Sequence, residues 1–356
     1  MNVSLDVFLD TLGIDSSLVD TVIGLNDIEL KDLEKCYTFN GIGATSETLH
    51  MGHYNLYNLL NRIVKTKGFP LMFQLATDQK RFRKGSCITL GHARTLEDAL
   101  LESLRCVDWD RNVHFFSNID PRNALVLRNC ADYINAKIKI SSALSVFGNV
   151  DVHSCFMIGM QLAPLVIFSK IIFVDYLPLI LIESSEEGYF LLVRDICGTL
   201  GIKKPVIVRI HSFKDIHLTS KMSTSEPKKT IMLSEKGLDA LKNGVSGVDH
   251  LTDYLLYLQK NLLNTLEDSK KGAVHRLMQD YLKEINQSSK HKQLFISHFT
   301  KHLLQKHEPI PKRSIYQILQ IYDSKFTINR DLLDSTEENN ERICMSIDSL
   351  ERNYLN

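Results

Sequence analysis

The sequence has no excess of charge of either sign, because 42 basic side chains are balanced by 42 acidic ones among 356 residues. No overall field would therefore attract nucleic acid or an anionic membrane, and any such partner must meet a local patch. The first twenty residues contain acids but no Lys or Arg. Secretory signals begin with basic residues and mitochondrial transit peptides are rich in arginine, so neither is expected. The sequence favours a cytoplasmic protein.

Long hydrophobic runs and clustered metal ligands are also missing. The most apolar stretch, residues 162–182, is interrupted by Lys170, Asp175 and two prolines, which argues against a membrane-spanning helix. The seven cysteines are scattered without any Cys-x-x-Cys pair, a pattern typical of reduced thiols. No His or Cys pair has further ligands nearby at zinc spacing, so we expect no metal site held by the protein alone. The Gly-x-Ser-x-Gly motif of nucleophilic serines is absent as well.

What the sequence does contain is an alternation of apolar strands with helices, followed by a region with helical patterns only. Runs such as residues 70–75, 171–174, 177–182 and 205–210 are apolar throughout, which is typical of parallel strands covered on both faces. We predict an α/β fold with three parts: an N-terminal helical segment at 1–35, a Rossmann-type parallel-sheet domain at 36–235 with a helical insertion at about 80–160, and an all-helical domain at 236–356.

One motif points to nucleotide binding. His50-Met51-Gly52-His53 follows a predicted strand and the glycine-rich turn that contains Gly41 and Gly43. Doubly wound proteins bind nucleotides at the turn between the first strand and the first helix. Two histidines three apart lie on one helix face and can reach the phosphates of ATP, while Gly52 leaves room for a base or ribose. Alone, such a short motif is most often a chance match, and its position after a strand and a glycine turn gives it weight.

A second motif lies in a polar segment after the strand at residues 205–210. It reads Lys221-Met222-Ser223-Thr224-Ser225. A lysine on such a loop can neutralise the charge that develops on a departing pyrophosphate. The loop by itself would be interpreted as a solvated basic turn, but the two motifs in this order, about 170 residues apart, are much more specific.

Together the motifs resemble the HIGH and KMSKS signatures of class I aminoacyl-tRNA synthetases, which activate an amino acid with ATP and transfer it to tRNA. Residues 41–53 are most similar to the Gly-x-Gly-x-Ser-Ser-Glu-x-x-His-x-Gly-His segment of the eukaryotic and archaeal tryptophanyl-tRNA synthetases. The resemblance also includes a strand that ends in Gln74, a Gln-x-Ala-Pro segment at 161–164, and Glu226-Pro227 after the lysine loop. It extends from about residue 37 to residue 233 and fades beyond.

The resemblance implies ATP-dependent activation of tryptophan and its transfer to tRNA, with Mg²⁺ bound to the ATP phosphates and with a homodimer formed through the inserted segment. It implies His50, His53 and Lys221 as catalytic residues. Residues expected at ATP are Gly41, Gly43, His50, Gly52, His53, Lys221, Met222, Ser223 and Ser225. Those expected at the amino acid are Phe39, Gln74, Gln161 and Glu186.

The chain departs from the family pattern in the expected amino-acid pocket. Phe39 stands where the family has a tyrosine that contacts the indole, and Gln79 stands where it has a glutamate. Ser185-Glu186-Glu187 replaces an Asp-Gln-Asp triplet, and Ile42 replaces an arginine found in many members. The ATP machinery is thus expected to be intact and the pocket altered. Two alternatives remain: a tyrosyl-tRNA synthetase, or a catalytically impaired synthetase-like protein that binds tRNA or another protein.

The C-terminal third carries a local basic excess. From Lys260 to Arg313 there are eleven Lys and Arg against five Asp and Glu. Basic clustering is typical of nucleic-acid contacts, although a solvated helical surface has the same composition. In a synthetase this region would meet the tRNA anticodon.

Overall fold

A computed structural model of the chain describes residues 3–43, 48–78, 88–148, 152–215, 217–223, 226, 229–234, 257, 264–265, 272, 275–276 and 306–322. At its centre is a six-stranded sheet with the order β1-β6-β5-β2-β3-β4. The strands are β1 (Val19–Ile23), β2 (Cys36–Ile42), β3 (Leu71–Leu75), β4 (Val113–Ser117), β5 (Leu177–Ile182) and β6 (Val206–Ile210). Strands β2 to β6 pair in parallel, and β1 joins the edge antiparallel to β6.

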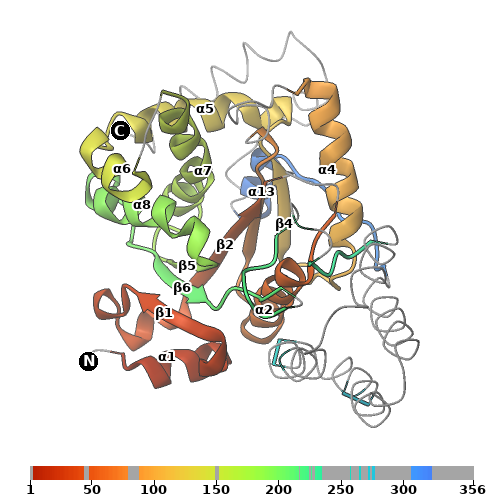
Figure 1. Ribbon diagram of the computed structural model, residues 1–356. Coiled ribbons are helices and arrows are strands. Elements are labelled where there is room, and N and C mark those ends of the chain that lie inside the picture. The colour runs from red at the N-terminus through yellow and green to blue at the C-terminus, as the bar shows by residue number, and fades with distance from the viewer. Residues whose placement is uncertain are drawn as a thin grey trace.

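Helices cover both faces of this sheet (Figure 1). They are α1 (Leu5–Leu12), α2 (Met51–Lys67), α4 (Leu90–Leu104), α5 (Pro121–Asn135), α6 (Ile140–Phe147), α7 (Val152–Ile171), α8 (Glu187–Leu200) and α13 (Ile315–Tyr322). Alternate residues of β3 enter different cores: Phe73 packs with α2 and α4, and Met72 packs with α5, α7 and α8. Burial of both faces explains why the strands are apolar throughout. The predicted Rossmann-type α/β fold is confirmed.

Two local predictions were wrong. Residues 19–23, predicted within a helical segment, form strand β1, in which Val19 pairs with Ile210 and Ile23 with Ile207. Residues 171–174, predicted as a strand, are the last residue of α7 and the three that follow it, and Phe173 is buried in the core on that side of the sheet. Short apolar runs fit either state, because only the tertiary partner decides whether a strand ladder can form.

The C-terminal segment 306–322 returns to the free edge of the sheet beside β4 (Figure 1). Its Arg313 main-chain nitrogen donates to the Phe115 carbonyl at 2.8 Å, and Ile315 donates to the side chain of Asn123. Helix α13 then buries Ile318 and Leu319 in the core that contains α5. This segment is therefore part of the α/β unit. Most of the predicted all-helical domain at 236–356 lies outside the described residues, and its fold stays a prediction.

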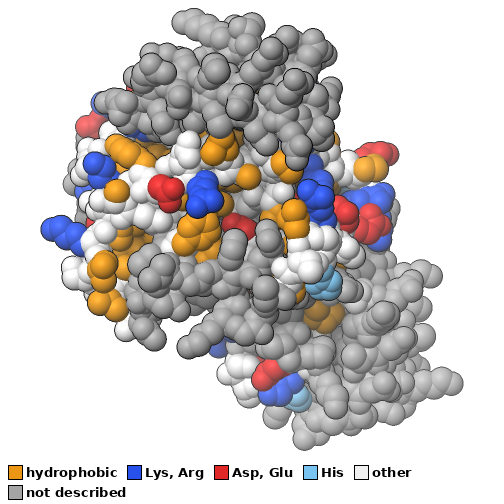
Figure 2. Space-filling model, turned by 90° about the horizontal axis from the view of Figure 1, so that it is seen from above, with side chains coloured by type: hydrophobic (Ala, Val, Ile, Leu, Met, Phe, Trp, Pro, Cys, Tyr) orange, Lys and Arg blue, Asp and Glu red, His pale blue; other side chains and the backbone are white. Residues whose placement is uncertain are grey.

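The basic residues described near the C-terminal end contact partners on the α/β unit. Lys306 forms an ion pair with Glu102, Lys312 with Glu97, and Arg313 hydrogen-bonds His114. Seen from above, the described surface shows Lys, Arg, Asp, Glu and apolar side chains intermingled, with no field of one sign (Figure 2). Within the described part of the chain, none of the helices has the length and apolar character needed to cross a membrane.

Candidate active site

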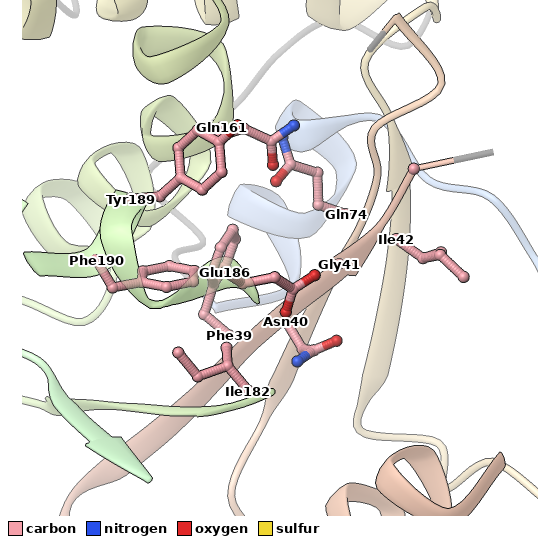
Figure 3. A pocket seen from close by; sticks show the side chains of 11 residues that line it. Phe39, Asn40, Gly41, Ile42, Gln74, Gln161, Ile182, Glu186, Tyr189 and Phe190 are labelled. Carbon is pink, nitrogen blue, oxygen red and sulfur yellow. The ribbon is translucent and has the colours of Figure 1, made fainter. Parts of the chain in front are cut away.

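The carboxyl ends of the parallel strands surround one pocket (Figure 3). It encloses about 450 Å³, its open mouth included, and all four predicted amino-acid-binding residues line it, together with Gly41 and Gly43. Its complete lining is Phe39, Asn40, Gly41, Ile42, Gly43, Gln74, Gln161, Ile182, Glu186, Tyr189 and Phe190. The sequence-based prediction of the site did not include Asn40, Ile182, Tyr189 or Phe190. Tyr189 and Phe190 follow Glu186 on the first turn of α8, so the position of Glu186 was the signal for them.

The pocket combines an aromatic wall with a few polar groups. The rings of Phe39 and Phe190 pack edge to face, with their centroids 6.2 Å apart. Among its polar atoms, the Nε2 of Gln161 and the Oδ1 of Asn40 are buried and have no hydrogen-bond partner within the described part of the protein. Buried polar atoms normally have partners, so these two atoms indicate that a ligand with its own donors and acceptors enters here. A flat ring with a polar end fits such a lining.

Two glycines are required by close packing. A Cβ at Gly41 would lie 2.9 Å from both the Cβ and the carbonyl oxygen of Gln74 on the neighbouring strand. A Cβ at Gly52 would lie 3.0 Å from ring atoms of His50 and 3.2 Å from the Cβ of Phe213. A side chain at Gly52 would therefore press against His50 and Phe213.

The two histidines of the first motif are stacked at the start of α2. The Nδ1 of His50 accepts from the main-chain nitrogens of Gly52 at 3.1 Å and His53 at 3.4 Å, which caps the helix. The ring centroids of the two histidines lie 3.8 Å apart. Because Nδ1 of His50 accepts, its proton is on Nε2, which leaves an N–H free to donate. The Nδ1 of His53 is buried without a partner within the described residues.

Burial keeps both rings neutral. It lowers the pKa of His50 well below the usual value, and the neighbouring His53 and Lys221 add to the effect. Burial and the charge of Lys221 lower the pKa of His53 to about 4. Near neutral pH the two histidines are therefore uncharged. They can bind a phosphate by donating N–H hydrogen bonds, but not by an ion pair.

The lysine of the second motif ends a short hairpin. Two main-chain hydrogen bonds join the arms of this hairpin. The Met222 nitrogen donates to the Phe213 carbonyl at 2.8 Å, and the Asp215 nitrogen donates to the Ser220 carbonyl at 2.8 Å. The carboxylate of Asp215 also accepts from the hydroxyls of Thr219 and Ser220. The Met222 side chain is buried in the core, and Ser223 pairs with Thr230. Predicted residue Ser225 lies outside the described residues.

The tertiary structure brings the two motifs to one edge of the sheet. The main chain after the lysine loop pairs with the main chain on both sides of His50: Met51 donates to the Ile231 carbonyl at 2.9 Å, and Leu233 donates to the Leu49 carbonyl at 2.8 Å. The charge of Lys221 acts on both histidines. A phosphate between the motifs would meet both the N–H groups of the histidines and the ammonium group of Lys221.

The side chain of Lys221 contacts the end of β5. Its Nζ forms an ion pair with Glu183 and donates to the Ser185 hydroxyl at 3.1 Å. Glu183 was not among the predicted site residues, and nothing in the sequence pattern marked it.

The Ser185-Glu186-Glu187 triplet has three separate contacts. Ser185 binds Lys221, Glu186 lines the pocket, and Glu187 forms an ion pair with Arg209. Burial, and next the charge of Glu183, raise the pKa of Glu186 to about 7, while Lys221 acts in the opposite direction. Glu186 can therefore gain or lose a proton near neutral pH. The other altered position, Gln79, lies outside the described residues.

No family model matches the sequence. The cytoplasmic tryptophan–tRNA ligase of Arabidopsis thaliana is 23% identical over 221 residues, which are 60% of this chain and 54% of that protein. Over this stretch the chain is similar to the tryptophan–tRNA ligases. It spans about half the length of the curated relatives that it matches.

Solved structures of tryptophanyl- and tyrosyl-tRNA synthetases have this fold. The tryptophanyl-tRNA synthetase of Encephalitozoon cuniculi bound to tryptophan superposes with a TM-score of 0.62 at 18% identity and covers 84% of this chain and 89% of that one. The tyrosyl-tRNA synthetase of Aeropyrum pernix gives a TM-score of 0.58 at 12% identity, with coverage of 83% and 92%. At these identities the fold is shared by both amino-acid specificities.

Proposed function

We propose that this chain is a tryptophan–tRNA ligase, which activates tryptophan with ATP and transfers it to tRNA. The observation that carries the proposal is the convergence of His50, His53 and Lys221 beside a pocket that contains Gln74, Gln161 and Glu186. The sequence similarity to tryptophan–tRNA ligases supports tryptophan as the amino acid. The cytoplasmic relatives support the cytoplasm as the location, and a homodimer remains part of the proposal.

In the activation step, a carboxylate oxygen of tryptophan attacks the α-phosphorus of ATP. The new bond joins that oxygen to phosphorus, and the bond from phosphorus to the bridging oxygen breaks, so that pyrophosphate leaves with its electron pair. Lys221 neutralises the charge that develops on the leaving group, and the neutral histidines donate N–H hydrogen bonds to phosphate oxygens. No proton transfer is needed, so catalysis consists of positioning and charge stabilisation.

The lysine must change partners during this step. In the structure Lys221 is bound to Glu183 and Ser185, and a bound triphosphate would compete with Glu183 for the ammonium group. Mg²⁺ accompanies ATP and is usually held by its phosphates more than by protein ligands. Within the part of the chain that is described, no group of three or more His, Cys, Asp or Glu comes together as a metal site.

The amino acid would be held by its ammonium group and its ring. Glu186 in its ionised form pairs with the ammonium, and the Nε2 of Gln161, which has no partner within the described residues, offers a donor to an acceptor atom of the ligand. Phe39, Tyr189 and Phe190 supply the aromatic wall.

The test is ATP–pyrophosphate exchange measured with each amino acid in turn. We expect tryptophan to give the fastest exchange. Faster exchange with tyrosine would favour the tyrosyl-tRNA synthetase alternative. No exchange with any amino acid, together with retained tRNA binding, would favour an inactive synthetase-like binding protein.

A further inference from the structure

The amide of Gln74 is held from behind the pocket wall. Its Nε2 donates to the Oδ1 of Asn118 at 3.0 Å and to the main-chain oxygen of Met160 at 3.1 Å. A main-chain carbonyl can only accept a hydrogen bond, so the NH₂ end of Gln74 must face Met160. The carbonyl oxygen of Gln74 is therefore left on the pocket side, as Figure 3 shows.

Asn118 is oriented in turn by Asp78. Its Nδ2 donates to the Oδ1 of Asp78 at 2.9 Å. Since the Nε2 of Gln74 donates to Asn118, Asn118 must turn its oxygen to Gln74 and its NH₂ to Asp78. The series Asp78–Asn118–Gln74–Met160 thus has an accepting oxygen at each end. Only one orientation of the Asn118 and Gln74 amides gives every hydrogen bond in it both a donor and an acceptor. We call this series the amide relay.

The relay rests on strand ends that are fixed to each other. Asp78 and Asn118 follow the neighbouring strands β3 and β4, and the residues before them, Thr77 and Ser117, both donate to one oxygen of Glu97 at 2.6 Å. Glu97 is 2% exposed, and its other oxygen accepts from Lys312 at 3.2 Å. The relay is thereby held in place before any substrate binds.

We propose that Asn118 and Asp78 are positioning residues for substrate selection, because they fix the Gln74 amide with its carbonyl oxygen toward the pocket. This inference rests on the proposed function and adds a reason for the choice of ring. A ring that carries an N–H donor pairs with the Gln74 oxygen, whereas an isosteric ring without the donor leaves that oxygen buried and unsatisfied. Phe39 has no hydroxyl that could accept the ring N–H. The discrimination between the two rings therefore depends more on the oxygen of Gln74.

The test compares two ligands that differ in one group. Tryptophan and 3-(3-benzothienyl)alanine, in which sulfur replaces the indole N–H, are titrated into the full chain, and their affinities are expressed as a ratio. In the wild-type protein we expect tryptophan to bind roughly tenfold more tightly, the value of one buried hydrogen bond. In Asn118→Ala the ratio should fall toward one, because only the hydrogen bond to Met160 then holds the orientation of the Gln74 amide. Asp78→Asn, which removes the acceptor-only end, should give a ratio in between.

Asn61→Ala is the matched control. Asn61 is equally buried, and its side chain also makes two hydrogen bonds, to the Asp108 carbonyl and from the Asp110 nitrogen, but it does not line the pocket. Its loss should lower stability as Asn118→Ala does while leaving the ratio unchanged. Should Asn118→Ala fail to fold, Asn118→Ser removes the same hydrogen bonds with a smaller loss of volume.

The outcomes separate the relay from the proposed function. If the wild-type protein binds neither ligand, the proposed function fails. If it prefers tryptophan and a folded Asn118 variant keeps that preference, the relay is not the selecting element. The acceptor role would then pass to another group in the pocket, such as the Oδ1 of Asn40, which has no partner among the residues that the structure describes.

Discussion

The two halves of the candidate active site are built differently. On the nucleotide side, two short stretches of sequence are held mainly by main-chain hydrogen bonds, because the segments at Leu49 and Leu233 pair directly, and the side chain of His50 adds a cap on its own helix. On the amino-acid side, isolated residues from β2, β3, α7 and the start of α8 converge on one pocket. There the position of an amide such as Gln74 depends on side chains behind the pocket wall.

This difference predicts how each half responds to substitution. Main-chain hydrogen bonds do not depend on the identity of the side chain, so the geometry of the nucleotide side should survive most changes, and only loss of the reacting groups should stop the reaction. The amino-acid side depends on a few oriented polar groups, so single changes there should alter affinity and selectivity while the chemistry continues.

The largest expected effect is on the nucleotide side. Lys221→Ala should lower the rate of ATP–pyrophosphate exchange on the order of 10²–10³-fold, because the lysine acts on charge that develops in the transition state. Tryptophan affinity measured by titration should change little. Lys229→Ala is the control, because Lys229 is a half-exposed lysine of the same region whose partner is Glu226. An unchanged exchange rate would remove Lys221 from the mechanism.

The next effect is a pH dependence of amino-acid binding. The raised pKa of Glu186, about 7, means that its carboxyl is protonated below neutral pH and cannot pair with an ammonium group. Tryptophan affinity should therefore fall on the order of tenfold as the pH is lowered from 7.5 to 5.5. The two histidines do not titrate in this range, since the pKa of each is depressed. Glu186→Gln should bind more weakly at pH 7.5 and flatten the profile; a variant with the wild-type profile would exclude Glu186 as the titrating group.

A smaller gain is expected from Phe39→Tyr. The added hydroxyl supplies a second acceptor for the indole N–H, and one neutral hydrogen bond is worth about 0.5–1.5 kcal/mol, so tryptophan should bind up to roughly tenfold more tightly. Calorimetric titration measures this change, and the benzothienyl analogue should not share it. Equal tightening of both ligands would mean that the substitution acts through packing against Phe190.

The smallest effect should come from Glu183→Gln. The neutral amide releases Lys221 from its ion pair, so ATP no longer competes with a carboxylate and its apparent affinity should rise by about threefold, the value of a partly exposed ion pair. The pKa of Glu186 should also fall, because the charge of Glu183 contributes to raising it. Weaker ATP binding in this variant would show that Glu183 holds Lys221 in its working position.

Much of this site was predictable because local sequence determines it. The parallel sheet followed from strands that are apolar throughout, and helices α2 and α8 followed from their spacing of apolar residues. The residues expected at the amino acid, Phe39, Gln74, Gln161 and Glu186, do line one pocket. Phe39, Gln74 and Glu186 lie on or just after parallel strands, whose carboxyl ends come together whatever the details of packing, and Gln161 reaches the pocket from α7.

Other features could be decided only by the tertiary structure. Strand β1 forms because β6 offers it an edge, and the segment 306–322 completes the opposite side beside β4; neither pairing leaves a signal in its own residues. The roles of Asn118, Asp78 and Glu183 depend on partners 38 to 44 positions away in the chain. The sequence by itself determined which chemical groups this protein has and which strand ends carry them. The direction of the Gln74 amide, the neutrality of the histidines and the partner of Lys221 depend on burial and on which groups face each other, and these arise only when the chain is packed.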